Sequence, residues 1–280
     1  MPVSDVAELL AAYDAQVRDH VSDPLPRGVT VERDGPLLRY LGLAGRGFVL
    51  YRDLGGLEGA DLDELIARQV RVFANRGEGF EWKLHGHDRP ADLPQRLSAA
   101  GFVPEETETI VIAPVADIAA EARLPDGVSL REVTSRADFE RIAALEQAVW
   151  GDEEQQSWLV DMLESERAVD PDALSIVVAE AGATVVCAAW IRFERGTEFA
   201  TLWGGATLPE WRRRGIYRAT VTYRATLAAG RGFHYLETDA SDDSRPILEQ
   251  LGFTAVTTTT PYVWSPPTGS RRRSEATRLA

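Results

Sequence analysis

The most informative segment of the chain reads Gly204-Gly205-Ala206-Thr207-Leu208-Pro209-Glu210-Trp211-Arg212-Arg213-Arg214-Gly215-Ile216-Tyr217. It follows an apolar strand pattern, turns at Pro209 and leads into a predicted helix over 213–229. Backbone N–H groups that open a helix lack internal partners and lie at the positive end of its dipole, so they bind phosphate groups. Gly215 would let an anion approach the main chain, and the three arginines add charge. The segment predicts a pyrophosphate-binding loop; the alternative is an ordinary strand-to-helix turn with solvated arginines.

Hydrophobic periodicity places this loop late in a regular series of elements. The second half of the chain is expected to contain strands at 128–133, 175–179, 184–193, 198–206, 233–238 and 253–264, and helices at 135–149, 153–167, 213–229 and 242–251. The first half is expected to contain helices at 4–19, 61–75 and 91–99, and strands at 29–31, 37–43, 47–51, 80–84 and 107–113. The pattern predicts a mixed α/β protein.

Loop and element order together resemble the GNAT superfamily of acyl-CoA-dependent N-acyltransferases. Its signature is Arg or Gln, two residues, Gly, one residue, then Gly or Ala; Arg212 and Gly215 match it, while Tyr217 occupies the last position. Residues 236–253 are also similar to the family's fifth strand, its following helix and the closing Gly-Phe. The resemblance implies the acyl-CoA N-acyltransferase fold, an α/β (α+β) fold around a mixed sheet.

The two halves repeat each other, which favours two tandem copies of this fold. The Gly-x-Gly-Phe pattern of residues 77–80 returns at 230–233, and the Leu-x-x-x-Gly-Phe of 97–102 returns at 248–253. We predict a degenerate GNAT-like domain over 1–114, a linker over 115–127, a GNAT N-acetyltransferase domain over 128–265 and a disordered tail over 266–280. The first domain lacks the Arg-x-x-Gly motif and is expected to bind no CoA.

The resemblance implies that acetyl-CoA lies between the fourth and fifth strands of this fold. The pantetheine amides would meet backbone groups near Ala206, Thr207 and Leu208. The expected cofactor-binding residues are Ala206, Thr207, Leu208, Arg212, Arg213, Arg214, Gly215, Ile216, Tyr217 and Arg218. No metal is expected, because the single cysteine excludes a Cys-rich site and His85-Gly86-His87-Asp88 is interpreted as a turn.

Two positions depart from the family pattern and leave the proton-transfer groups open. Many members carry a tyrosine where this chain has Leu248, and an acidic residue on the fourth strand where this chain has 201–203. Tyr217 and Glu198 are the catalytic candidates, and a water chain without a dedicated residue is an equal alternative. For the acceptor, aromatic walls from Trp150, Trp158 and Tyr262 suit an amine, unless these side chains belong to the core.

Composition limits the class of partner. The 280 residues carry a net charge of −14, which disfavours binding of nucleic acid. The N-terminus lacks a signal-peptide pattern and no apolar run is long enough for a membrane, so a soluble, cytoplasmic protein is expected, its oligomeric state open. The predicted function is transfer of an acetyl group from acetyl-CoA to a primary amine of a small molecule or peptide in a ternary complex. The alternative is a catalytically weak or inactive CoA-binding regulatory or interaction protein.

Overall fold

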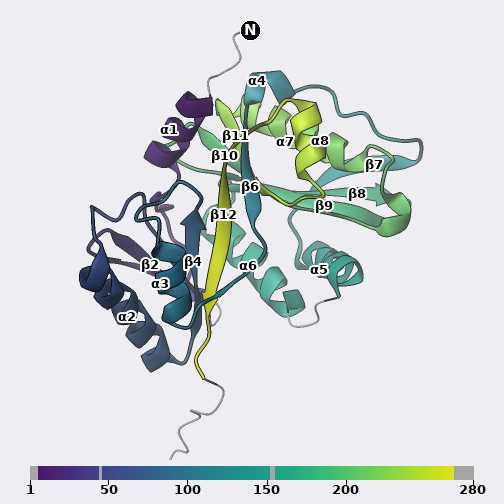
Figure 1. Cartoon of the computed structure of the whole chain (residues 1–280). Helices are drawn as coiled ribbons and strands as arrows, with labels where there is room; N and C mark the ends of the chain where they lie inside the picture. Colours follow the sequence, from purple (N-terminus) through teal and green to yellow (C-terminus); the bar gives the residue numbers. More distant parts are fainter. Residues whose placement is uncertain (1–5, 44–45, 152–154, 268–280) are drawn as a thin grey trace, which may run out of the picture.

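One mixed sheet runs through both halves of the molecule. The structure is a computed structural model that describes residues 6–43, 46–151 and 155–267 (Figure 1). Within these residues twelve strands form the sheet, in the order β1-β2-β3-β4-β12-β6-β11-β10-β9-β8-β7, with β5 paired to β12. The mixed α/β prediction is confirmed, and the sheet is continuous across the two halves.

The first half supplies the strands at one side of the sheet. Its elements are α1 (Val6–Gln16), β1 (Thr30–Asp34), β2 (Leu37–Leu43), β3 (Arg46–Leu50), α2 (Gly59–Arg76), β4 (Gly79–His85), α3 (Leu93–Ala99), β5 (Val103–Pro104) and β6 (Glu108–Pro114). Helices α2 and α3 cover one face, where Phe73 and Leu97 pack with Phe80 and Trp82 of β4.

The second half supplies the other side. Its elements are α4 (Val115–Ile118), β7 (Val128–Val133), α5 (Arg136–Trp150), α6 (Gln155–Val169), β8 (Leu174–Ala181), β9 (Thr184–Phe193), β10 (Phe199–Thr207), the 3-10 helix η1 (Pro209–Trp211), α7 (Ile216–Gly230), β11 (Tyr235–Ala240), α8 (Arg245–Leu251) and β12 (Thr254–Trp264). Neighbouring residues of a strand point to opposite faces, and Ile191 packs beneath α7 while Trp190 packs beneath α5. Helices α4, α7 and α8 therefore cover one face, and α5 and α6 cover the other.

The last strands of the two halves are exchanged. β12 pairs antiparallel with β4 of the first half, where Tyr262 lies opposite Trp82, and β6 pairs antiparallel with β11 of the second half. The exchanged strands β6 and β12 also pair with each other (Figure 1). Each half therefore has a sheet completed by a strand from the other half. This symmetric arrangement agrees with the sequence repeat, and the predicted domain boundaries stay a prediction.

The first helix is shorter than the predicted 4–19. It ends at Gln16, and residues 4 and 5 lie outside the described residues. Beyond it the chain turns so that the buried Arg18 pairs with Asp88 at 2.6 Å, and the other carboxylate oxygen of Asp88 accepts a hydrogen bond from Tyr51. The turn at residues 85–88 thereby holds α1 on the sheet, together with the contact between His85 and Tyr13.

The structure describes the predicted linker but only the start of the predicted tail. Residues 115–127, predicted as a linker, begin with α4, because Val115 and Ile118 are buried against the core beneath α7. Of the predicted tail, residues 268–280 lie outside the described residues, as do 153 and 154 of the predicted helix 153–167. Among the described helices, none is both long and apolar enough to cross a membrane.

Candidate active site

Strands β10 and β11 separate around a cavity of about 730 Å³. Their parallel pairing covers Phe199↔Tyr235 to Thr201↔Glu237. Farther along β10, the register against β9 shifts between Gly204 and Ala206, which is the sign of a β-bulge. Because both strands continue past their last pair, the end of each one forms a wall of the cavity.

Five further elements complete the walls. The lining residues are Glu108, Glu146, Val149, Trp150, Gly204, Gly205, Ala206, Thr207, Trp211, Arg212, Arg213, Gly215, Ile216, Tyr217, Arg218, Thr238, Asp239, Ser241, Asp243, Ser244 and Ile247. They come from β6, α5, β10, the loop before α7, α7 itself, β11 and the region of α8. Glu108 belongs to the first half of the chain, so both halves contribute to the cavity.

The N-terminus of α7 opens into this cavity. Gly215 precedes the helix with φ of 81°, and a Cβ built on it would meet no atom within 4 Å. The space beside this backbone is therefore open to a ligand. Arg213 has φ of 60°, a conformation that non-glycine residues seldom adopt, and Arg212 donates from Nε to the Thr207 carbonyl at 3.0 Å. A helix N-terminus with open space and arginines beside it can bind an anion.

The structure brings eight of the ten predicted CoA-binding residues to the cavity. These are Ala206, Thr207, Arg212, Arg213, Gly215, Ile216, Tyr217 and Arg218. Leu208 instead packs on the hydrophobic core, and the Arg214 guanidinium lies over the Trp211 ring, 4.7 Å from its centre. The prediction for Leu208 concerned its backbone groups, so the packing of its side chain does not test it.

The two catalytic candidates lie at different ends of β10. Tyr217 lines the cavity against Gly205, where a Cβ would come within 2.6 Å of the Tyr217 ring, and burial raises the pKa of its phenol. Glu198 precedes the start of β10, whereas the bulge lies toward the strand's other end. Glu198 is bonded there to Gln16 and His234, which lower its pKa, and it lines neither described cavity.

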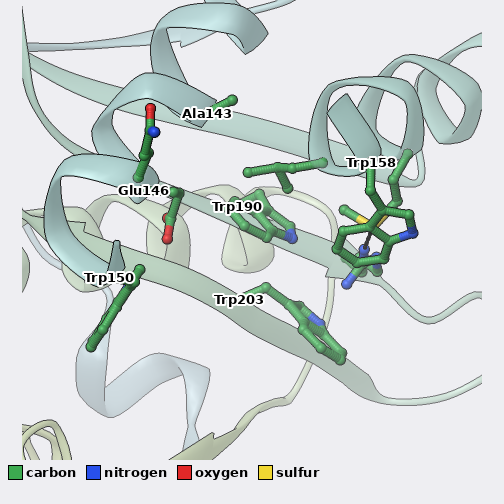
Figure 2. A pocket seen from close by; sticks show the side chains of 10 residues that line it. Ala143, Glu146, Trp150, Trp158, Trp190 and Trp203 are labelled. Carbon is green, nitrogen blue, oxygen red and sulfur yellow. Dashed lines mark hydrogen bonds between the residues drawn. The ribbon is translucent and has the colours of Figure 1, made fainter. Parts of the chain in front are cut away.

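A smaller cavity of about 220 Å³ adjoins the larger one. It is lined by Ala143, Glu146, Gln147, Trp150, Trp158, Leu159, Met162, Trp190, Arg192 and Trp203 (Figure 2). Glu146 and Trp150 line both cavities, so the two meet at these side chains. Trp150 and Trp158, two of the three predicted acceptor residues, thus line one cavity. Trp190, Trp203 and Glu146 were missed, because only the packing of α5 over β9 and β10 brings them there.

Tyr262, the third predicted acceptor residue, lies elsewhere. It is 8% exposed in the core of the first half, opposite Trp82 on β4. It was expected in one wall with Trp150 and Trp158, but strand exchange carries β12 to the other half. Tyr262 is therefore a core residue of the first half.

Helix α5 holds Glu146 at the junction of the cavities. Its N-terminus is capped by Ser135, whose Oγ accepts from the Asp138 N–H at 3.2 Å, and it ends at Gly151 with φ of 79°. Phe139 and Ile142 bury one face of the helix against the sheet. Figure 2 shows the Glu146 carboxylate pointing from the helix into the space near Trp150 and Trp190.

The Glu146 carboxylate is electrostatically unusual. Its Oε1 is buried and has no hydrogen-bond partner among the described residues. Burial raises the pKa of Glu146 to about 7, and a hydrogen bond with the Trp150 side chain offsets part of that rise. A carboxyl group with a pKa near neutrality can release and take up a proton at working pH.

Carboxylates also gather where the first half meets the larger cavity. Burial and the neighbouring Asp239 raise the pKa of Glu108 to about 7 and that of Glu237 to about 8. Lys83 of β4 pairs with Asp239 at 2.5 Å and opposes this accumulation of negative charge. Among the described residues, no group of three or more His, Cys, Asp or Glu side chains has the arrangement of a metal site.

Comparisons with known proteins agree with this geometry. Several solved structures share the fold over nearly the whole chain. A GCN5-related N-acetyltransferase from Kribbella flavida is 16% identical, with a TM-score of 0.63 and coverage of 94% of this chain and 95% of that one. A tandem GNAT protein from the clavulanic acid biosynthesis pathway is 14% identical, with a TM-score of 0.60 and coverage of 95% and 97%. The protein therefore has the tandem GNAT fold.

The sequence comparison finds a family match within the second half. The sequence model of the acetyltransferase (GNAT) family matches residues 139–253, which contain the bulged strand, the arginine loop and α7. No curated protein matches the chain. The fold and the match over residues 139–253 support a tandem GNAT-type form and acyl-CoA-dependent acetyl transfer in general.

Proposed function

We propose that the protein transfers an acetyl group from acetyl-CoA to a primary amine of a small molecule by direct attack in a ternary complex. The observation that carries this proposal is the larger cavity. The bulged end of β10 and the N-terminus of α7 line the same cavity, and a Cβ on Gly215 would meet no atom within 4 Å. Acetyl-CoA carries a thioester arm and a pyrophosphate, so it needs a strand end for the arm and a helix N-terminus for the pyrophosphate in one cavity.

In this proposal, main-chain groups of the protein make most of the contacts with acetyl-CoA. The end of β10 at Ala206 and Thr207 offers main-chain groups to the pantetheine amides, because β11 has separated from it. The loop N–H groups near Gly215, with Arg212 and Arg213, hold the pyrophosphate. The first half has no comparable loop in its sequence, so a single acetyl-CoA is expected per chain.

The chemistry requires an oxyanion donor and two proton movements. A backbone N–H at the β10 bulge can stabilise the oxyanion that forms when the amine attacks the thioester carbonyl. Tyr217 lines the cavity, and the rise in its phenol pKa keeps it protonated, so we propose it as the donor to the departing thiolate. Glu198 has no role in this scheme because it lines neither cavity.

The test is thermal unfolding with and without acetyl-CoA. A ligand that binds only the native state stabilises it by about 2.7 kcal/mol at a hundredfold excess over Kd. Gly215→Glu should abolish the shift, since it places a carboxylate at the proposed pyrophosphate site. Gly232→Glu is the matched control, because Gly232 also has φ of 81° and open space around it but lines neither cavity.

The control separates backbone strain from ligand repulsion. Both variants should lose similar stability without ligand, and Gly232→Glu should keep the full acetyl-CoA shift. A wild-type protein that shows no shift at saturating acetyl-CoA or longer acyl-CoAs would refute the proposal and favour an interaction protein. Where the shift is present, release of free thiol with added amines measures turnover.

A further inference from the structure

The smaller cavity contains two buried polar atoms that have no hydrogen-bond partner among the described residues. One is Oε1 of Glu146, an acceptor, and the other is Nε1 of Trp190, a donor on a side chain that is 7% exposed. Figure 2 shows the Trp190 nitrogen directed into the space between Trp158 and Trp203. A buried polar group without a partner is costly, and a ligand that satisfies both atoms would remove that cost.

We infer that the smaller cavity is the acceptor site, that it takes a compact primary ammonium carrying a neutral hydrogen-bond acceptor, and that Glu146 accepts the ammonium proton. The inference rests on the proposed function, since it names the class of amine and the base for that reaction. The Glu146 carboxylate meets the ammonium, and the Trp190 N–H meets the acceptor atom of the ligand.

Aromatic walls and charge balance favour a cation. Four indole rings, from Trp150, Trp158, Trp190 and Trp203, line a space of about 220 Å³, and ring faces attract ammonium groups. The other charged group that lines this cavity is Arg192, whose guanidinium lies 4.5 Å from the Trp203 ring centre.

Arg192 does not cancel the negative charge of Glu146. Its guanidinium already donates two hydrogen bonds to the Glu166 carboxylate, at 2.8 and 2.9 Å. The Arg192–Glu166 pair is therefore neutral as a unit, and the ionised Glu146 is left as the uncompensated charge of the cavity. An ammonium ligand supplies the missing positive charge.

The position of Glu146 connects binding with chemistry. Glu146 lines both cavities, so an ammonium bonded to it lies where the acceptor cavity opens toward the bulge of β10. The ionised carboxylate takes one proton from R–NH₃⁺ and leaves R–NH₂, whose lone pair forms the C–N bond as the C–S bond breaks. After the C–N bond forms, the nitrogen loses one more proton and becomes the N–H of the product amide. The departing thiolate gains a proton, and Glu146 returns to solvent the proton that it took from the ammonium.

The test measures amine binding to the full-length protein without acetyl-CoA. Three probes of equal heavy-atom count separate the two contacts: 3-methoxypropylamine has both groups, pentylamine lacks the acceptor atom, and 3-methoxypropanol lacks the ammonium. At pH 8, tryptophan fluorescence and calorimetry should show that 3-methoxypropanol binds about tenfold or more weakly than 3-methoxypropylamine, because a hydrogen bond to a charged group is lost. Pentylamine should bind about two- to tenfold more weakly, as expected for one neutral hydrogen bond.

Matched variants assign these differences to residues. Glu146→Gln should reduce the preference for 3-methoxypropylamine over 3-methoxypropanol to about twofold or less, since the charge-assisted bond is gone. Glu140→Gln, the same change on the exposed face of α5, should leave both affinities unchanged. Trp190→Phe should remove the preference over pentylamine, and melting curves of each variant report whether the fold is intact.

The outcomes are separable from those of the proposed function. Equal binding of the amine and the alcohol by wild-type protein, or an unchanged preference in Glu146→Gln, would overturn the inference even if acetyl-CoA binds. A preference for the amine that depends on Glu146 would support the ammonium site even if acetyl-CoA gave no thermal shift. The two experiments therefore fail independently.

Discussion

Lys83 of β4 and Asp239 of β11 form an ion pair between the two halves of the chain, with 2.5 Å between Nζ and Oδ2. Lys83 is the only lysine in the sequence, and Asp239 lines the larger cavity. Burial opposes the charge on Lys83, but Asp239, Tyr13 and Glu237 together outweigh it and raise the pKa of the ammonium. The first half thus supplies the cation that balances carboxylates at the wall of the second half's cavity.

Replacing Lys83 by Met should destabilise the protein in a pH-dependent way. The pKa of Glu237 is about 8, raised by burial and Asp239 and lowered by Lys83, so removing Lys83 raises it further. A carboxyl whose folded pKa exceeds its unfolded value binds more protons when folded, so its contribution to stability is lost as pH rises through the folded pKa. Melting curves should show a deficit for Lys83→Met that is nearly constant below about pH 7 and grows from there to pH 9, as the wild-type Glu237 loses its proton near its pKa of about 8, reaching about 1–3 kcal/mol.

Lys83→Arg provides the control for charge. It keeps a cation near Asp239, so it should recover most of the stability at pH 9. A deficit of Lys83→Met that stays constant with pH would show that packing, and not charge balance, accounts for the loss.

Asp88 is expected to be one of the most sensitive positions for folding. It is a buried carboxylate that pairs with Arg18 and accepts hydrogen bonds from the Tyr51 hydroxyl and the His85 N–H. Asp88→Ala removes the buried carboxylate nearest the Arg18 guanidinium and leaves it only the longer contact with Asp14, at 3.6 Å, and that with His87; loss of a buried ion-pair partner typically costs about 3–5 kcal/mol. Urea unfolding measures this change in the free energy of unfolding.

The exposed Asp63 is the comparison for Asp88. Its carboxylate pairs with Arg96 on the surface, so Asp63→Ala should cost no more than about 1 kcal/mol. Similar losses for the two variants would contradict the view that Asp88 holds α1 and its turn on the sheet.

Strand exchange predicts that the halves fold only together. A fragment of residues 1–120 lacks β12, which lies between β4 and β6, and a fragment of 121–267 lacks β6, which lies between β11 and β12. Each fragment would expose unpaired strand edges in the middle of the sheet. We expect both to be insoluble alone and soluble when co-expressed, as judged by size-exclusion chromatography. Two monomeric, folded fragments would argue against this dependence.

Activity should depend on the ionisation of Glu146. Because its pKa is about 7 and the carboxylate is the base form, kcat/KM for an amine acceptor should rise with pH through about 7 and then level off. Glu146→Gln should lower kcat about 10²- to 10⁴-fold, the usual contribution of a general base, and should remove this limb of the profile. Glu140→Gln should retain both the rate and the profile. A profile that persists in Glu146→Gln would assign the titration to another group.

Local sequence was sufficient for much of the fold. β7 and β9 occupy the predicted residues 128–133 and 184–193, and most other elements differ by one to three residues at their ends. The loop before α7 was also predictable, because a strand end, a turn at Pro209 and a glycine before a helix are consecutive features of the chain. Such features depend on backbone preferences of neighbouring residues, which the sequence states directly.

The partners of the last strands and the lining of the smaller cavity depend on contacts between distant parts of the chain. Tyr262 was expected near Trp150 but lies in the other half, because β12 crosses to β4 and the pairing of distant strands depends on the whole sheet. Glu146 resembles any other carboxylate on an amphipathic helix until α5 packs over Trp190 and Trp203. Its burial, its unpaired oxygen and its raised pKa arise from that packing, so the residue that we propose as the base is set apart by contacts between elements and not by a motif.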